Sequence, residues 1–276
     1  MRRALLSLGL MCLQFAMVAQ ALNVLTYNIR YDNAADNKDA WPFRSAHVAA
    51  YLNKQGSDII GIQEALIQQV EFLDSSLSNY ERFGVGRDDG VNRGEFSPIY
   101  WKKNQFRFVA GKTYWLSETP DVPSKGWDAA CTRIATVVEL ESVVLGTHVC
   151  VINTHWDHEG MVARSNSALL MNQWVSNALA KGNNVIVMGD FNCTPSDPAL
   201  QPIQQSLTDL CPKKFRTRST FNAFKMRGVK GKHIDAIYTS ICSREHYKID
   251  QPKTPSGRQL SDHFPVSVSV TFKPNY

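Results

Sequence analysis

Asp190 and Asn192 are a carboxylate and a carboxamide placed two residues apart at the end of an apolar run. They lie in the segment "MGDFNCTPSDP" (188–198), directly after "NNVIV". Residues two apart on an extended backbone project to the same side, so both groups can reach one ligand. Taken alone, Asp190 is more often a helix cap or a turn residue than a catalytic group. The chemical interpretation therefore depends on partners elsewhere in the chain.

Polar side chains stand at the ends of several other apolar runs. Because ligands of α/β sheets bind beyond the carboxyl ends of the strands, we expect these groups to converge on one cleft. A cap, a turn or a solvated surface explains each residue singly, but not their repetition in one element after another. The set consists of Asn28 after "VLTY", Glu64 after "IIGIQ", His155 after "CVINT", Asp190 and Asn192, Asp235 within "HIDAIY", and Asp262 and His263 before "FPV".

Metal-assisted cleavage of a phosphoester is the chemistry that suits these residue types. Mg²⁺ prefers oxygen ligands and keeps several waters, so one or two carboxylates suffice to hold it. Glu64 and Asp262 are the candidate ligands, and Asn28 adds a carbonyl oxygen directly or through water. We expect Mg²⁺ as the cofactor, with Mn²⁺ able to substitute for it.

The other polar groups are candidates for proton transfer and for binding the phosphate. Asp190 can position and deprotonate the attacking water while Asn192 donates to a phosphoryl oxygen. His263 with Asp235 repeats the carboxylate-oriented histidine of hydrolases, and the sequence does not decide whether His263 or Asp190 takes the proton. Charge that develops on the phosphate also requires donors. The donors available are His155 and Arg133.

Six motifs, in this order along the chain, resemble the endonuclease/exonuclease/phosphatase superfamily: "TYNIR", "GIQEA", "INTHWDH", "VMGDFN", "KHIDAIY" and "SDHFPV". The resemblance extends from Asn23 to Thr271. It implies an α/β fold, a four-layer sandwich of two mixed β-sheets packed face to face with helices outside, and a Mg²⁺ site at one edge. "GRDDG" (86–90) and "GWDAACTRIA" (126–135) are similar to an exported bacterial branch near the deadenylase-type exonucleases.

The resemblance implies roles for the residues that match its motifs. Glu95, ahead of "SPIYW", is similar to a supporting glutamate that pairs with the histidine at the place of His155. The implied catalytic residues are His155, Asp190, Asn192, Asp235 and His263. The implied phosphate-binding residues are Arg133, His155 and Asn192. The implied metal-side residues are Asn28, Glu64 and Asp262.

Apolar strand-like runs alternate with helix-like segments along the chain. Predicted strands cover 22–28, 58–64, 97–102, 107–116, 132–140, 148–155, 184–190, 232–240 and 264–272. Predicted helices cover 42–56, 66–78 and 162–180. Pro42 begins the first helix and Gly56 follows its end. The buried stripe predicted for the longest helix is Ala168, Met171, Val175 and Leu179. The loop 117–130, rich in Pro, Gly and Asp, is expected on the surface, where it could line the site.

Residues 1–21 have the features of an export signal. Arg2 and Arg3 precede an apolar stretch, and Ala19 and Ala21 give the small-residue cleavage pattern. We expect residues 22–276 to form one domain that is exported to the periplasm or secreted, is monomeric and does not insert stably into a membrane. The net charge of +5 becomes +3 without Arg2 and Arg3, which is compatible with an anionic substrate.

The cysteine pattern argues against a zinc cluster or a redox motif. Of six cysteines, five follow the predicted leader, and none forms a CxxC pair. An odd number leaves at least one thiol unpaired within the chain. Cys193 and Cys211 are one candidate pair for a disulfide.

The substrate class stays open at the level of sequence. The pattern favours a nuclease of RNA 3′–5′ exonuclease or endonuclease type, whose partner would be nucleic acid. We expect it to cleave by in-line attack of an activated water. Candidate stacking platforms for bases, or else core residues, are Trp115, Trp127 and Trp156. The alternative is a phosphatase or phosphodiesterase of inositol-phosphate or sphingomyelinase type, which a closed pocket capped by 117–130 would favour. A non-catalytic binding module is disfavoured because every position that the chemistry needs is filled.

Overall fold

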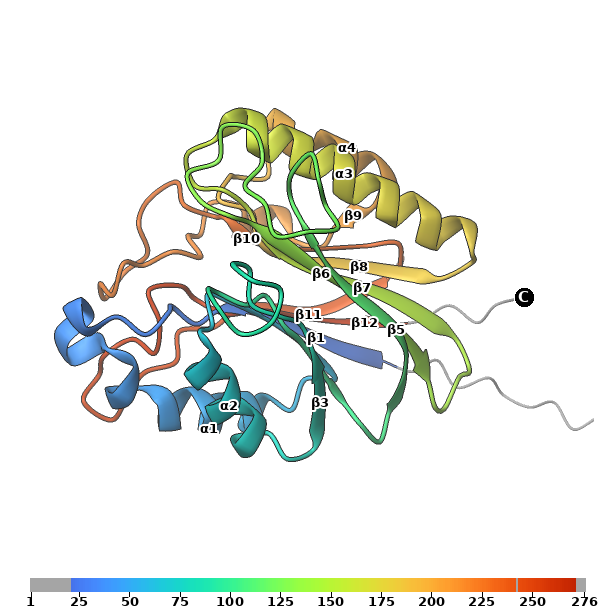
Figure 1. The fold of residues 1–276 in the computed structure, drawn as a ribbon. Coiled ribbons are helices and arrows are strands. Elements are labelled where there is room, and N and C mark those ends of the chain that lie inside the picture. Colours follow the sequence, from blue (N-terminus) through green and yellow to red (C-terminus); the bar gives the residue numbers. More distant parts are fainter. Residues whose placement is uncertain (1–20, 242, 272–276) are drawn as a thin grey trace, which may run out of the picture.

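Two mixed six-stranded sheets pack face to face in the computed structural model, which describes residues 21–241 and 243–271 (Figure 1). The strand order is β11-β12-β1-β2-β4-β3 in the first sheet and β5-β6-β7-β8-β10-β9 in the second. The first sheet contains β1 Ala21–Asn28, β2 Ile59–Gln63, β3 Tyr80–Phe83, β4 Ile99–Lys102, β11 Ser243–Ile249 and β12 Val266–Thr271. The second contains β5 Phe106–Trp115, β6 Ile134–Ser142, β7 His148–His155, β8 Asn184–Asp190, β9 Thr208–Asp209 and β10 Asp235–Thr239.

Helices cover the outer face of each sheet. In Figure 1, α1 (Ser45–Gln55) and α2 (Ile67–Ser76) lie below the first sheet, and α3 (Met161–Ala180) and α4 (Gln201–Ser206) lie above the second. Short 3-10 turns at Ala34–Asp39, Trp41–Phe43, Pro198–Leu200 and Lys213–Phe215 complete the helical segments. The predicted four-layer sandwich is confirmed.

Three apolar cores correspond to the three interfaces between these layers. One lies between the sheets and includes Val24 and Ile59 of the first sheet with Val151 and Ile186 of the second. The other two lie between each sheet and its helices. A central strand is therefore buried on both faces, which explains why these strands read as continuous apolar runs rather than as alternating ones.

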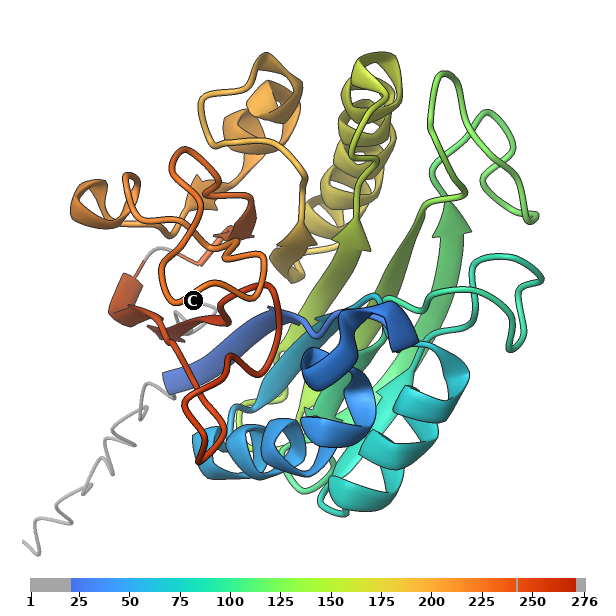
Figure 2. The same cartoon turned by 90° about the vertical axis from the view of Figure 1, so that its left-hand side faces the viewer.

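The central strands of both sheets end at the same edge of the molecule. β1 and β2 are parallel neighbours in the first sheet, and β7 and β8 are parallel neighbours in the second. Their carboxyl ends point toward the left-hand edge in Figure 1, and Figure 2 looks onto that edge. Loops that follow these strands are therefore brought together there.

A buried polar network fixes the two sheets to each other near this edge. Gln63 Nε2 donates to Thr26 Oγ1 (3.0 Å) and to Asn153 Oδ1 (2.6 Å). Asn153 Nδ2 in turn donates to the carbonyl oxygens of Ile62 (2.7 Å) and Pro98 (2.9 Å). Because buried polar groups without partners are costly, this network favours a single alignment of the sheets.

Most predicted elements are found within a few residues of their expected bounds. The strand predicted at 148–155 is β7, and the longest helix is α3 at Met161–Ala180. Gly56 follows α1 in the left-handed conformation (φ 57°), whereas Pro42 belongs to a 3-10 turn before the helix. In the predicted stripe of α3, Ala168, Met171 and Val175 are buried, but Leu179 is half-buried because Ala178 takes the inward position.

Four elements were not predicted: β3, β9, β11 and α4. The sequence "SREHYKI" of β11 is largely charged and polar, because this strand lies at the edge of its sheet. The strand β3, "YERF", is half-buried or exposed throughout. Neither segment carries the apolar run on which strand prediction depends.

The candidate disulfide between Cys193 and Cys211 is wrong, since both thiols are free. Cys193 lies in the core between the second sheet and its helices, whereas Cys211 lies in the core between the sheets. Cys242 and residues 1–20 of the predicted export signal lie outside the described residues, and Ala21 is the first residue of β1. Within the described part of the chain, no helix has the length and apolar character needed to cross a membrane.

Candidate active site

Three predicted functional side chains form one row across the second sheet. The parallel register pairs His155 of β7 with Asp190 of β8, and the antiparallel register pairs Asp190 with Asp235 of β10. Directly paired residues project to the same face of a sheet, so the register itself assembles an imidazole and two carboxylates. Gly189 allows the close approach of β8 to β7, because its φ is 148° and a Cβ there would lie 2.0 Å from the carbonyl oxygen of Thr154.

His263, in the loop before β12, completes this group. Its Nδ1 lies 2.9 Å from Asp235 Oδ2, and its Nε2 lies 3.6 Å from Asp190 Oδ2. Burial lowers the pKa of His263, but the charges of Asp235 and Asp190 outweigh burial and hold it well above its usual value. Burial, with the charge of Asp235, raises the pKa of Asp190 to about 7. These shifts favour the protonated form of the His263 imidazole and disfavour the ionised form of the Asp190 carboxylate.

Glu64 faces this row from the first sheet. It follows β2 in a left-handed conformation (φ 64°), which is strained for a residue other than glycine and is typical of functional sites. Asn28 Nδ2 donates to Glu64 Oε1 (2.9 Å) and to Asp190 Oδ2 (3.0 Å), so one amide links the two sheets. The Oδ1 of Asn28, predicted to reach the metal, accepts the backbone N–H of Arg30 (3.0 Å). In this structure Asn28 orients the two carboxylates.

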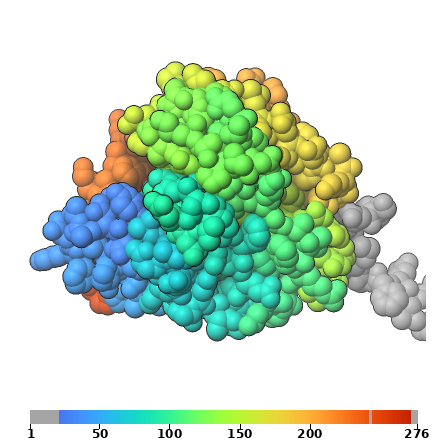
Figure 3. Space-filling model, viewed as in Figure 1, coloured from blue at the N-terminus to red at the C-terminus, as the bar shows by residue number. Residues whose placement is uncertain are grey.

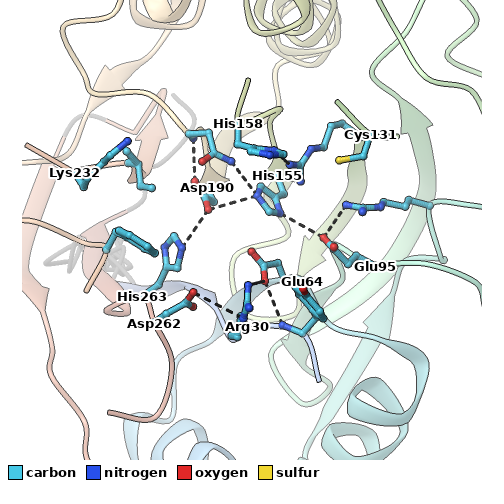
Figure 4. Close-up of a pocket in the computed structure, with 16 residues that line it drawn as sticks. Arg30, Glu64, Glu95, Cys131, His155, His158, Asp190, Lys232, Asp262 and His263 are labelled. Carbon is cyan, nitrogen blue, oxygen red and sulfur yellow. Dashed lines mark hydrogen bonds and ion pairs between the residues drawn. The ribbon is translucent and has the colours of Figure 1, made fainter. Parts of the chain in front are cut away.

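Asp262 lies across the cavity from Glu64, with Arg30 between them (Figure 4). Arg30 Nη1 is 4.0 Å from Glu64 Oε2, and its Nε is 4.0 Å from Asp262 Oδ2. Its guanidinium makes closer bonds to Asp36, at 3.0 and 3.1 Å. Burial and the charge of Glu64 raise the pKa of Asp262. The charges of His263, Arg30 and Arg44 oppose this rise, so the floor of the cavity combines carboxylates with nearby positive charges.

The donor set at this floor fits a hard divalent cation. Glu64, Asp190 and His263 offer donor atoms that all lie within 4.8 Å of one another, and Asp262 adds a further carboxylate beside them. Buried carboxylates in mutual repulsion are stabilised by a cation, and oxygen-rich sites of this kind suit Mg²⁺ or Mn²⁺. Asp262, predicted as a metal ligand together with Glu64, is not among these three residues and lies across the cavity, so Glu64 is the predicted ligand that belongs to the group.

A second group with metal-ligating side chains, Cys131, Asp157 and His158, has a different role. Asp157 accepts hydrogen bonds from backbone N–H groups, among them that of Gly160 (2.7 Å), and lies 3.4 Å from Arg133 Nε. Arg133 Nη2 donates to His158 Nδ1 (2.9 Å). Although burial raises the pKa of Asp157, these donors hold it well below its usual value. The carboxylate therefore organises the wall of the cavity around Arg133.

His155 is a neutral imidazole with a defined tautomer. Asn192 Nδ2 donates to His155 Nε2 (3.0 Å) and to the carbonyl oxygen of Trp156 (2.9 Å). The accepting Nε2 leaves the ring proton on Nδ1, which lies 3.7 Å from Glu95 Oε2. Burial and the charge of Arg133 lower the pKa of His155 well below its usual value. Both amide hydrogens of Asn192 are engaged, so its predicted donation to a phosphoryl oxygen requires one of these bonds to break.

Glu95 and Arg87 form the wall next to His155. Arg87 Nη1 lies 2.7 Å from Glu95 Oε2, and burial together with the charge of Glu64 raises the pKa of Glu95 to about 7. Trp115, the last residue of β5, donates from Nε1 to the carbonyl oxygen of Arg87 (2.6 Å). This bond holds the loop that contains Arg87 against the end of β5. In Figure 3 the teal surface of the loop around Arg87 meets the green surface of the segment that follows β5.

The cavity enclosed by these groups has a volume of about 450 Å³. Cys131 and Arg133 line it, but no residue of the loop 117–130 does, so the expectation that this loop lines the site is wrong. Trp156 is fully buried and Trp115 is 5% exposed, so neither can stack on a base. Trp127 is half-buried and lies outside the lining.

The predicted site residues converge as expected from their places at strand ends. Those that line the cavity are Glu64, Glu95, Arg133, His155, Asp190, Asn192, Asp262 and His263. Asn28 and Asp235 lie directly behind them and bond to Glu64 and His263. Sequence reasoning missed four lining residues with basic side chains: Arg30, Arg87, His158 and Lys232. Each lies inside a motif already noted, so basic residues within those motifs were the available signal.

Comparisons with known proteins agree with this geometry. A family model described as "Endonuclease/Exonuclease/phosphatase family" matches residues 25–263. A crystal structure of an endonuclease/exonuclease/phosphatase from Bacteroides vulgatus is 32% identical, with a TM-score of 0.82, and the match covers 92% of this chain and 100% of that one. A mannosyl-6-phosphatase from Bacteroides thetaiotaomicron is 31% identical, with a TM-score of 0.80, and the match covers 91% of this chain and 100% of that one.

More distant similarities concern the fold or part of the chain. TDP2 from D. rerio, in complex with a single-stranded DNA product, is 16% identical with a TM-score of 0.68, and the match covers 90% of this chain and 98% of that one. An uncharacterized protein of Acanthamoeba polyphaga mimivirus is 27% identical over 159 residues, which cover 55% of this chain and 59% of the length of that protein.

Proposed function

The chain belongs to the endonuclease/exonuclease/phosphatase family, and on that premise we propose that this phosphoesterase is a Mg²⁺-dependent phosphatase of small phosphate esters, such as a phosphorylated sugar. The observation that carries the proposal is the size of the cavity, although the loop 117–130 does not cap it as the sequence led us to expect for this substrate class. Its volume of about 450 Å³ is bounded by the ion pair of Arg87 with Glu95 and by the Arg133 wall. A space of this size is typical of a small-ligand site. The mannosyl-6-phosphatase similar to this chain supports the same substrate class.

The side chains of the cavity divide the reaction between them. Asp190, whose pKa is about 7, accepts the proton of the attacking water. His263 stays protonated beside Asp235 and donates from Nε2 to the oxygen on which charge develops. Arg133 and His155 line the cavity on the side where the phosphoryl oxygens would bind, and the Arg133 guanidinium supplies donors to them.

Glu64 and Asp262 would hold the metal at the floor of the cavity. When bound, Mg²⁺ would supply positive charge against the negative charge of the phosphoryl group. Asn28 keeps Glu64 and Asp190 at a fixed separation, because its amide donates to both. The phosphate would thus be held between the metal side and the proton-transfer side of the cavity.

Release of inorganic phosphate from mannose 6-phosphate tests the proposal. We expect release that requires Mg²⁺ or Mn²⁺, stops with EDTA and is lost in His263→Ala. A parallel reaction with 5′-labelled poly(A) examines the nuclease alternative under the same conditions. Shortening of the oligomer without release of phosphate from a panel of sugar and inositol phosphates would contradict the proposed phosphatase.

Cleavage of phosphodiester bonds in nucleic acid is the second candidate function. It is favoured by the exposed lysine and arginine side chains of residues 213–232, of which Lys232 lines the cavity. It is disfavoured by burial of Trp115 and Trp156, which removes two of the three stacking platforms that the sequence suggested. In the poly(A) reaction, a ladder of products would indicate removal of nucleotides from one end, and scattered fragments would indicate internal cleavage.

A further inference from the structure

A second, smaller cavity adjoins the catalytic one. Its volume is about 230 Å³, and it lies between the turn after β8 and the segment that leads into β10. Lys232 lines both cavities, so they are neighbours at this residue. In Figure 4 the Lys232 side chain lies on the His263 side of the catalytic cavity, away from Glu95. Lys232 thus separates the place of a ligand held at Asp190 and His263 from the second cavity, which a longer ligand would enter past its side chain.

The segment that forms one side of this cavity is strongly basic. Residues 211–234 contain eight lysine and arginine residues and no aspartate or glutamate. Arg216 is paired with Asp209 at 3.0 Å. Arg218 and Lys232 are exposed, and neither has an ion pair with a carboxylate among the described residues. The second cavity therefore presents positive charge that the protein does not neutralise.

The donors of this cavity are held in place by local contacts. The guanidinium of Arg218 lies over the ring of Phe215, at 4.6 Å from the centroid, which orients the group and leaves its edge free to donate. His233 Nδ1 donates to the carbonyl oxygen of Arg218 (2.8 Å) and fixes the backbone there. On the opposite side, Thr194 and Ser196 add two hydroxyl groups that lie 3.1 Å apart.

An arginine, a lysine and hydroxyl groups around one small cavity are the groups that bind phosphate in proteins. One water occupies about 30 Å³ of liquid, so the cavity has room for a phosphate with some of its hydration. The acid-free segment also disfavours a cation at this place. Neutral sugar hydroxyls would not require the unpaired charges of Arg218 and Lys232.

We propose that this cavity is a subsite for a second phosphate group of the substrate, bound by Arg218 and Lys232 while the scissile phosphate lies between Asp190 and Glu64. The proposal rests on the proposed phosphoesterase function and predicts a preference for substrates that carry two phosphates over those that carry one. The second phosphate can belong to a small bisphosphorylated sugar or to the neighbouring nucleotide of a strand. Both present the same chemistry to the subsite.

A pair of sugar substrates tests the subsite through kcat/KM. The probes are mannose 1,6-bisphosphate and mannose 6-phosphate. We expect the wild-type protein to prefer the bisphosphate and Arg218→Gln to reduce that preference by about tenfold, because one charge-assisted contact is lost. Lys225→Gln is the matched control, since Lys225 is exposed in the same segment and lines neither cavity. An unchanged preference in Arg218→Gln, or an equal reduction in Lys225→Gln, would exclude a sugar bisphosphate as the source of the second phosphate.

Equilibrium binding separates this proposal from the proposed phosphatase activity. Calorimetric titration of the Asp190→Asn protein with mannose 1,6-bisphosphate and with 5′-phosphorylated oligo(A) needs no turnover. If the bisphosphate binds more weakly to the double variant Asp190→Asn/Arg218→Gln than to Asp190→Asn alone, the result supports a subsite for a second sugar phosphate. Weakening confined to the oligonucleotide assigns the second phosphate to a nucleic-acid strand. If both ligands bind the double variant as tightly as they bind Asp190→Asn, the result contradicts the subsite.

Discussion

The two sheets contribute to the active site in different ways. The second sheet supplies His155, Asp190 and Asp235 from paired positions on β7, β8 and β10, so hydrogen bonding between strands fixes their spacing. The first sheet supplies Glu64 from a strained position just past β2, and Asp262 comes from the loop before β12. Proton transfer requires fixed distances between protein groups, whereas Mg²⁺ keeps several of its waters and needs only one or two protein carboxylates.

Asn28 is the point at which the two sets of residues meet. Its amide donates to Glu64 on one side and to Asp190 on the other. Changes in the second sheet should therefore affect the rate of reaction even when metal is saturating. Changes in the first sheet should affect metal affinity first.

The largest effect is expected from the proton-transfer group. His263→Ala and Asp190→Asn should each lower kcat by about 10³-fold or more, because the general acid and base act as one unit. Steady-state rates at saturating Mg²⁺ measure this, with circular dichroism as a check of folding. If a higher metal concentration restores the rate, these residues act in metal binding, and the division between a proton-transfer sheet and a metal-binding sheet is wrong.

Metal affinity should change next. Glu64→Gln removes a charge at the floor of the cavity and should weaken Mn²⁺ binding by at least about tenfold. Titration calorimetry with Mn²⁺ measures the dissociation constant without reference to activity. Glu71→Gln is the matched control, since Glu71 is exposed on α2. Equal affinities in Glu64→Gln and the wild type would remove Glu64 from the metal site.

The alignment of the sheets should depend on Asn153. Asn153→Ala leaves Gln63 Nε2 and two buried carbonyl oxygens with fewer partners, and should lower the free energy of unfolding by about 1–3 kcal/mol. Urea denaturation measures the change. Asn177→Ala, at an exposed position of α3, should leave stability unaltered. A similar loss in both variants would show that the network does not join the sheets.

The smallest effect concerns pH. The charge of Asp235 raises the pKa of both Asp190 and His263. Activity requires ionised Asp190 and protonated His263, so it should rise through the first pKa and fall through the second. Asp235→Asn lowers both values, and both limbs of the profile of kcat/KM against pH should shift toward lower pH. Limbs that stay in place or shift upward would show that Asp235 does not control these groups.

The strand ends of the site could be predicted from sequence because each central strand reads as an apolar run followed by a polar residue. Asp190 and His155 were found in this way, and the register then places them side by side. Arg87 and Lys232 could not be located, because their positions depend on how the loops around them return to the cavity. The motifs that contain these two residues mark them as candidates but do not give the path of their loops.

The errors have a common physical origin in burial. Two of the three tryptophans suggested as stacking platforms, Trp115 and Trp156, are core residues. Trp156 packs beneath the site against Phe191, with ring centroids 4.9 Å apart. Composition alone does not distinguish an aromatic side chain that faces a cavity from one that faces the core. The suggested pairing of Cys193 with Cys211 failed for the same reason, because the two thiols lie in different cores.

A crystal of the protein soaked with Mn²⁺ and inorganic phosphate would test the central claim most directly, through anomalous diffraction from the metal. The account predicts an anomalous peak bounded by Glu64 and Asp262, with the phosphate between that peak and the row of His155, Asp190 and His263. A peak at Cys131, Asp157 and His158 instead, or phosphate bound away from Asp190, would contradict the division of the site between the two sheets.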